Sequence, residues 1–132
     1  MLGRSTYTRD ELDAARTRID AQLAGFRALG DGPAAAFGPD FLAGLVLVLD
    51  RLFVHRVRAV SGKDTNPVTE VELLAASLLT GDTFVDQKAV KWVPAKSVTG
   101  IAVGEPIRLD LATAEALAEA YLTEIEKRFV TA

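Results

Sequence analysis

The stretch between Asp40 and Asp50 constrains the fold of this chain more than any other. It reads FLAGLVLVL, nine residues without a polar side chain. A helix that is apolar on every side is either buried or spans a membrane. A span requires about 20 apolar residues, so we expect a buried helix and no membrane contact. We place this central helix at about 39–60, with Pro39 in its first turn, covered by its neighbours or by a second copy of the chain.

A first helix is predicted at about 9–29. Thr8 and Glu11 have the spacing of a capping box, and apolar residues then recur every three or four positions. Gly30 suits a helix end because glycine accepts a left-handed backbone conformation. The residues that follow, GDGPAAAFGPD, are predicted to form a loop.

Two further helices have clear starting signals. For a helix at about 67–80, Asn66 is the expected N-cap, its side-chain oxygen accepting the N–H of Val68 or Thr69, and Pro67 takes the first helical position. For a helix at about 111–129, Asp110 is the expected N-cap. The polar face of this last helix is acidic, with Glu115, Glu119, Glu124 and Glu126.

Helical periodicity stops between residues 82 and 109, where prolines and glycines separate short, partly β-branched runs. This pattern predicts a small β-hairpin or ribbon. The expected fold is therefore mainly α: a four-helix bundle-like single domain of 132 residues, with a small β-hairpin insert between helices three and four.

The composition narrows the function classes. The chain has no cysteine, which excludes disulfides and thiolate chemistry and favours a cytoplasmic location. Its formal net charge of −3 argues against a duplex-DNA binder, which usually presents a basic surface.

One helical face of the second predicted helix is basic. Arg51, His55 and Arg58 are spaced by four and three residues, so they share that face. With Lys63 and Glu70 nearby in the sequence, they could bind a phosphate or carboxylate. The simpler interpretation is that these cations complement the helix dipole and pair with Glu70, Glu72 or the acidic face of the fourth helix. The SGKD segment lacks the glycine and hydroxyl positions of a phosphate-binding loop.

A second candidate site surrounds the only tryptophan. Lys88, Lys91 and Lys96 flank Trp92, a combination that can bind single-stranded nucleic acid by stacking and phosphate contact. The alternative is that Trp92 covers the helices from the insert while the lysines are solvated. The net negative charge argues against a nucleic-acid role.

The sequence offers no coherent catalytic set and no cofactor motif. There is a single histidine and no nucleophile elbow. Without cysteine and without a Glu-x-x-His pair, no metal site is expected. These observations favour a non-enzymatic function over an enzyme.

Residues 53–129 resemble an uncharacterised family of short bacterial proteins common in actinobacteria. The resemblance lies in FVHRVRAVSGKDTNPVTEVELL, PAKSV, VGEPIRL and AYLTEIEKRF. It implies a small helical protein. No activity is assigned to that family, so it transfers no functional residues to this chain.

Three functions remain open after these observations. The leading hypothesis is a non-enzymatic helical module that forms a homodimer or binds an unidentified protein partner, because the second helix is unusually apolar for a small domain. A small-anion binding protein or enzyme is the alternative. Weak binding of single-stranded nucleic acid comes third.

Overall fold

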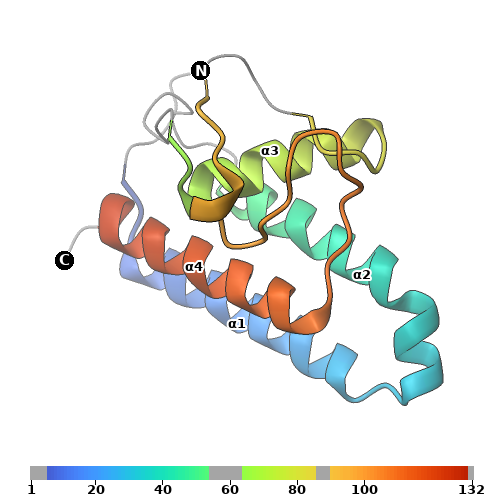
Figure 1. Cartoon of the computed structure of the whole chain (residues 1–132). Coiled ribbons are helices and arrows are strands. Elements are labelled where there is room, and N and C mark those ends of the chain that lie inside the picture. Colours follow the sequence, from blue (N-terminus) through green and yellow to red (C-terminus); the bar gives the residue numbers. More distant parts are fainter. Residues whose placement is uncertain (1–5, 54–63, 86–89, 131–132) are drawn as a thin grey trace.

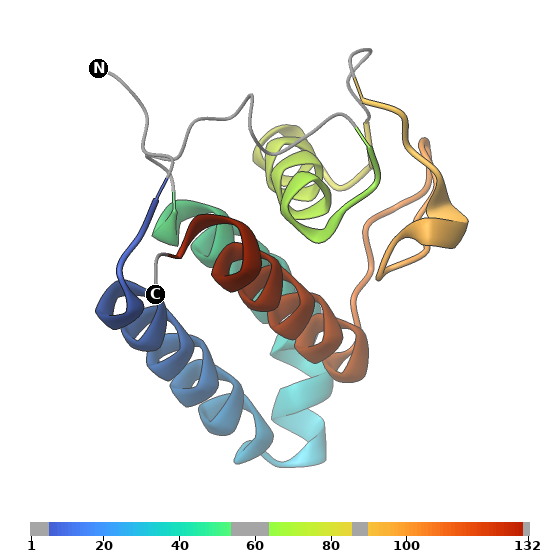
Figure 2. The ribbon, with the colours of Figure 1, turned by 90° about the vertical axis from the view of Figure 1, so that its left-hand side faces the viewer.

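The computed structural model describes residues 6–53, 64–85 and 90–130. Within these ranges lie four α-helices: α1 (Arg9–Arg27), α2 (Asp31–Leu52), α3 (Pro67–Thr80) and α4 (Leu111–Phe129). Helices α2 and α4 pack against each other in the middle, with α1 on one side of them and α3 on the other (Figure 1, Figure 2). The prediction of a mainly helical fold is confirmed.

Three helix starts follow the predicted caps. Thr8 and Glu11 form the capping box at the start of α1. The Asn66 side-chain oxygen accepts the backbone N–H of both Val68 and Thr69 at the start of α3. The Asp110 carboxylate accepts the N–H of Thr113 at the start of α4. Each cap satisfies N–H groups that have no partner inside the helix.

The predicted boundary between the first two helices is wrong. Helix α1 ends at Arg27, and α2 already begins at Asp31 rather than near Pro39. Gly30 has a φ of −69° and serves as the N-cap of α2, so it does not adopt the left-handed conformation expected of it. The supposed loop is helical because Pro33 falls in the first turn, where its missing N–H is harmless, and three strong helix formers follow at Ala34, Ala35 and Ala36.

Pro39 therefore lies inside α2. A proline in a helix interior removes one backbone hydrogen bond, and its ring crowds the carbonyl four residues earlier. The N-terminal turns of α2 run at an angle to the rest of the helix (Figure 1), as such a residue predicts. Residues 54–60, the predicted end of this helix, lie outside the described residues.

Ion pairs align α1 antiparallel to α4. Arg9 pairs with Glu126, and Arg16 lies 3.0 Å from Glu119. Arg27 lies 2.9 Å from Glu115. Most of the acidic face of α4 is therefore matched by arginines of α1. Exposed pairs of this kind add little stability, but their pattern favours one relative orientation of the two helices.

The described part of the insert contains no β-strand, so the predicted hairpin at 82–109 is wrong. Residues 82–85 and 90–109 include one short 3-10 helix, η2 (Pro94–Lys96), and a single antiparallel bridge between Thr83 and Pro106. The rest is irregular backbone that covers α3 (Figure 2).

Side chains of α3 and of the turn before it replace the missing strand partners. The hydroxyl of Ser77 accepts the N–H of Val85 at 3.0 Å, and the hydroxyl of Thr65 accepts the N–H of Val93 at 2.8 Å. Glu70 supplies a third acceptor, described below. Backbone groups held away from water require partners, and these side-chain acceptors supply them without a β-ladder.

The core lies where α2, α3 and α4 meet. Its largest fully buried apolar side chains are Tyr121, Phe53, Phe84, Leu12, Ile19, Leu45, Leu49, Leu73, Leu74, Leu117 and Ile125. Every helix contributes to this set, and Phe84 adds the insert. Aliphatic residues dominate the set, as the low aromatic content predicts.

Candidate functional site

The predicted anion site is described only in part. Arg51 is exposed near the end of α2, while His55, Arg58 and Lys63 lie outside the described residues. The placement of Arg51 leaves it accessible to a ligand or a partner. The prediction that His55 and Arg58 share a helical face with Arg51 therefore stays a prediction.

Glu70 is buried, with 1% of its surface exposed. Its carboxylate accepts the backbone N–H of Val98 at 2.9 Å, and also the N–H and hydroxyl of Thr99 at 2.9 and 2.7 Å. A carboxylate with three such donors is well satisfied in a buried place. In this structure Glu70 anchors the insert to α3.

Trp92 is half-buried against the core. Its indole N–H donates to the carbonyl of Ile101 at 2.9 Å, and its ring meets Phe84 edge-on with centroids 4.9 Å apart. Lys91 and Lys96 are exposed, and Lys88 lies outside the described residues. The indole thus packs against the core through Phe84 and Ile101, two residues of the insert, and nucleic-acid binding stays a prediction.

The described residues present no cluster of metal ligands, and one of their helices is long and apolar enough to span a membrane. No group of three or more His, Cys, Asp or Glu side chains is placed to hold a metal ion in the described ranges. Among the helices described, α2 alone has the length and apolar composition to cross a bilayer, a test that core helices also pass. Asp40 and Asp50 interrupt it, and its Leu42, Leu45, Val46 and Leu49 are buried against the other helices.

A second face of α2 is also apolar but is not fully buried. Phe37, Phe41, Gly44 and Val48 follow spacings of four, three and four residues, so they form one stripe along the helix. Phe37 is 51% exposed, and the other three are partly exposed. The Phe37 and Phe41 rings contact each other, with centroids 5.8 Å apart. We call these four residues the α2 stripe.

Two side chains of opposite charge lie along one edge of the α2 stripe. Asp40 and Arg51 are both exposed. Asp40 lies four residues before Gly44 and Arg51 lies seven residues after Gly44, so both side chains fall on the edge of the stripe that includes Gly44. Within the described part of the chain, neither side chain has an ion-pair partner. A Cβ built on Gly44 meets no heavy atom within 4 Å, so the centre of the stripe is open.

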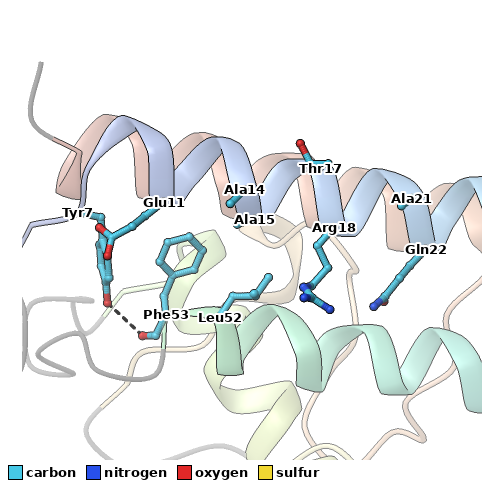
Figure 3. A pocket seen from close by; sticks show the side chains of 10 residues that line it. All are labelled: Tyr7, Glu11, Ala14, Ala15, Thr17, Arg18, Ala21, Gln22, Leu52 and Phe53. Atoms are coloured by element: carbon cyan, nitrogen blue, oxygen red, sulfur yellow. Dashed lines mark hydrogen bonds between the residues drawn. The ribbon is translucent and has the colours of Figure 1, made fainter.

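A groove runs between α1 and the C-terminal end of α2 (Figure 3). At one end of the helix pair the ring of Phe26 stacks on that of Phe41, with centroids 4.8 Å apart. At the other end the Tyr7 ring meets Phe53 edge-on at 4.9 Å, and the Tyr7 hydroxyl donates to the Phe53 carbonyl. Aromatic contacts thus hold both ends of the two helices together.

Between these ends α1 presents small side chains, which leaves the groove open. Its volume is about 770 Å³, within the range of small-molecule sites. Ala15 and Phe53 are buried in its floor and Leu52 is half-buried, whereas Ala14 and Ala21 lie exposed along its rim.

Arg18 and Gln22 are the polar side chains that α1 extends over the groove toward α2 (Figure 3). Arg18 is exposed, and neither residue has a hydrogen-bond or ion-pair partner in the part of the chain that the structure describes. Three other arginines of α1 are paired, because Arg9, Arg16 and Arg27 each contact a glutamate of α4. Among the described residues, the groove therefore has one cation without a partner, Arg18, with an amide beside it.

The acidic end of the groove is fixed in place. Both the backbone N–H and the hydroxyl of Thr8 donate to the Glu11 carboxylate, which lines the groove near Tyr7. Glu11 and Arg18 are two helical turns apart, or about 10 Å along the axis. The groove is thus negative near the start of α1 and positive farther along.

No protein-family model, curated protein or solved structure matches the chain. The resemblance to a family of short actinobacterial proteins therefore stays a prediction, and function must be inferred from the surfaces themselves.

The sequence reasoning missed the α2 stripe, Asp40, Arg18 and Gln22. The stripe was hidden because Phe37 was assigned to a loop, which removed its first member. A signal for Arg18 was present: α1 and α4 carry opposite charges, and a helical wheel turns Arg18 away from the face shared by Arg9, Arg16 and Arg27.

Proposed function

We propose that this chain is a non-enzymatic interaction module that self-associates as a homodimer through the α2 stripe. The observation that carries the proposal is that the stripe and its flanking charges are self-complementary. A partly exposed apolar stripe on a small protein favours an interface. The charges on its edge indicate which partner would fit.

The proposed dimer packs two copies of α2 antiparallel about a two-fold axis near Gly44. Phe41 and Val48 lie three residues before and four residues after Gly44, so each would meet the other across the axis. The same geometry brings Asp40 of each copy near Arg51 of the other. In a two-fold interface every contact occurs twice, so both pairs are doubled.

Gly44 suits the crossing point of the two helices. Glycine lets two backbones approach closely because it has no side chain. Here its Cβ position faces open space, so the space at the axis is available to the second copy. Phe37 and Phe41 supply the aromatic anchors that interfaces favour.

The first test is the mass in solution. Multi-angle light scattering at micromolar concentrations is expected to give twice the chain mass of 14.1 kDa. A mass of one chain at every concentration up to the millimolar range would contradict the proposal. So would a monomer that cosediments with lipid vesicles, because the stripe would then be a membrane-binding face.

The second test exchanges the flanking charges. Asp40→Lys and Arg51→Glu each place like charges together twice, so each is expected to weaken the dimer by about tenfold or more. The double variant restores opposite charges and is expected to recover most of the affinity. Asp20→Lys changes an exposed aspartate of α1 and serves as the matched control. If the double variant lost as much dimer affinity as the single variants, the proposed pairing of Asp40 with Arg51 would be contradicted.

A further inference from the structure

We propose that the groove between α1 and the end of α2 is a binding site for a small amphipathic carboxylate. The site is separate from the α2 stripe and does not depend on self-association. The ligand class follows from the distribution of apolar and charged groups along the groove.

The apolar part of the groove would hold the ligand's tail. Ala15, Leu52 and Phe53 provide a surface without exposed charge, and the groove volume of about 770 Å³ accommodates a short alkyl or aryl chain. Transfer of apolar surface out of water is the main source of affinity in sites of this kind.

The polar end of the groove determines the ligand's head group. Arg18 offers a planar fork of N–H donors, and Gln22, one helical turn later, adds an amide on the same side. A guanidinium binds a carboxylate through two parallel hydrogen bonds. Because Arg18 has no partner in the described part of the chain, no existing ion pair has to break when an anion arrives.

The fixed carboxylate of Glu11 sets the orientation of the ligand. An anionic head near Tyr7 would be repelled by Glu11, which is held by the cap of α1. The head therefore lies at Arg18 and the tail extends toward Phe53. The roughly 10 Å between Glu11 and Arg18 along the helix suits a medium-length chain.

Octanoate, 1-octanol and acetate separate the contributions of tail and head. Titration calorimetry with the full chain is expected to show octanoate binding, octanol binding about tenfold weaker because its head is neutral, and no binding of acetate. Backbone amide signals of residues 14–22 should shift with octanoate in NMR spectra. Equal affinity for octanoate and octanol would overturn the carboxylate assignment, and no binding of octanoate at millimolar concentration would overturn the site.

Two variants locate the site on the protein. Arg18→Gln is expected to weaken octanoate binding by about tenfold and leave octanol binding unchanged, whereas Arg108→Gln, at another exposed arginine, should change neither. Ala14→Leu keeps a good helix former and fills the groove, so it should abolish binding of both. Undiminished octanoate binding in Arg18→Gln or in Ala14→Leu, with circular dichroism showing a folded protein, would contradict the proposal.

Discussion

At the scale of single residues, Glu70 shows how one buried side chain organises a whole segment. Its carboxylate is the acceptor for two consecutive backbone N–H groups and a hydroxyl, all from residues 28 or 29 positions later. The sequence marks Glu70 as an acid on a helix near basic residues, which favours an ion pair. In the structure Glu70 is buried and anchors the insert through Val98 and Thr99. Local sequence spacing does not reveal this role because both partners come from a distant segment.

Removing this acceptor should be strongly destabilising. In Glu70→Ala the partly buried donors of Val98 and Thr99 lose their partner, and a donor left unsatisfied away from water costs up to about 1–3 kcal/mol. We expect a loss of about 3 kcal/mol or more in the free energy of unfolding, measured by urea denaturation. Thr99→Ser, which keeps the hydroxyl, should lose much less. A Glu70→Ala protein as stable as the original would show that the insert does not depend on this anchor.

A second residue-scale prediction concerns pH. The backbone N–H of Thr113 and then its side chain donate to Asp110 and hold the pKa of this carboxyl below its ordinary value. The ionised form is thus favoured in the folded state, so its contribution to stability is present at neutral pH and is lost as pH falls through the lowered pKa.

Asp110→Asn tests this contribution because asparagine caps a helix but does not titrate. Its free energy of unfolding should fall less steeply with decreasing pH in the acidic range than that of the original chain, as urea titrations at a series of pH values would show. An identical slope in both proteins would contradict a role for Asp110 in acid unfolding.

At the scale of elements, how well a helix was predicted depends on how local its signals are. Helices α3 and α4 were placed at their observed limits because Asn66, Pro67 and Asp110 act within a few residues of their own positions. The start of α2 was predicted wrongly because proline is common in the first turn of a helix, which favoured a start at Pro39. The alanines before Pro39 are strong helix formers and extend the helix toward Asp31.

The predicted β-hairpin at 82–109 does not match the structure for a different reason. Its β-branched residues resemble strands, but the N–H groups of Val85, Val93 and Val98 are bonded to side chains of Ser77, Thr65 and Glu70. Those partners come from another element, so no local pattern reveals them. The candidate sites show the same limit, because the α2 stripe and the groove exist only once α1 and α2 are placed together.

Pro39 allows a direct test of the observed start of α2. Inside a helix, proline is about 3 kcal/mol less favourable than alanine, whereas at the first position it is harmless. Pro39→Ala is therefore expected to raise the free energy of unfolding by about 1–3 kcal/mol, since the more flexible unfolded chain offsets part of the gain. Thermal and urea denaturation would measure it. A neutral or destabilising effect would indicate that the helix begins at Pro39 after all.

At the scale of the whole molecule, the described residues present two candidate binding surfaces with different chemistry. The α2 stripe is apolar with opposite charges on its edge, which favours a second copy of the same chain. The groove beside α1 combines an apolar floor with Arg18, which has no partner among the described residues, and this combination favours a small anion with an apolar tail. The absence of cysteine from the sequence makes the first of these surfaces easy to probe, because any disulfide must come from an introduced residue.

The most direct test of the proposed dimer is therefore disulfide formation in two single-cysteine variants under mild oxidation. Gly44→Cys places the thiol near the proposed two-fold axis, where its own copy faces it, so a covalent dimer should form rapidly on a non-reducing gel. Phe37→Cys lies seven residues away, which separates the two copies by about 20 Å along the axis, so it should remain monomeric although its position is more exposed. Cross-linking of Phe37→Cys as fast as, or faster than, Gly44→Cys would contradict the account.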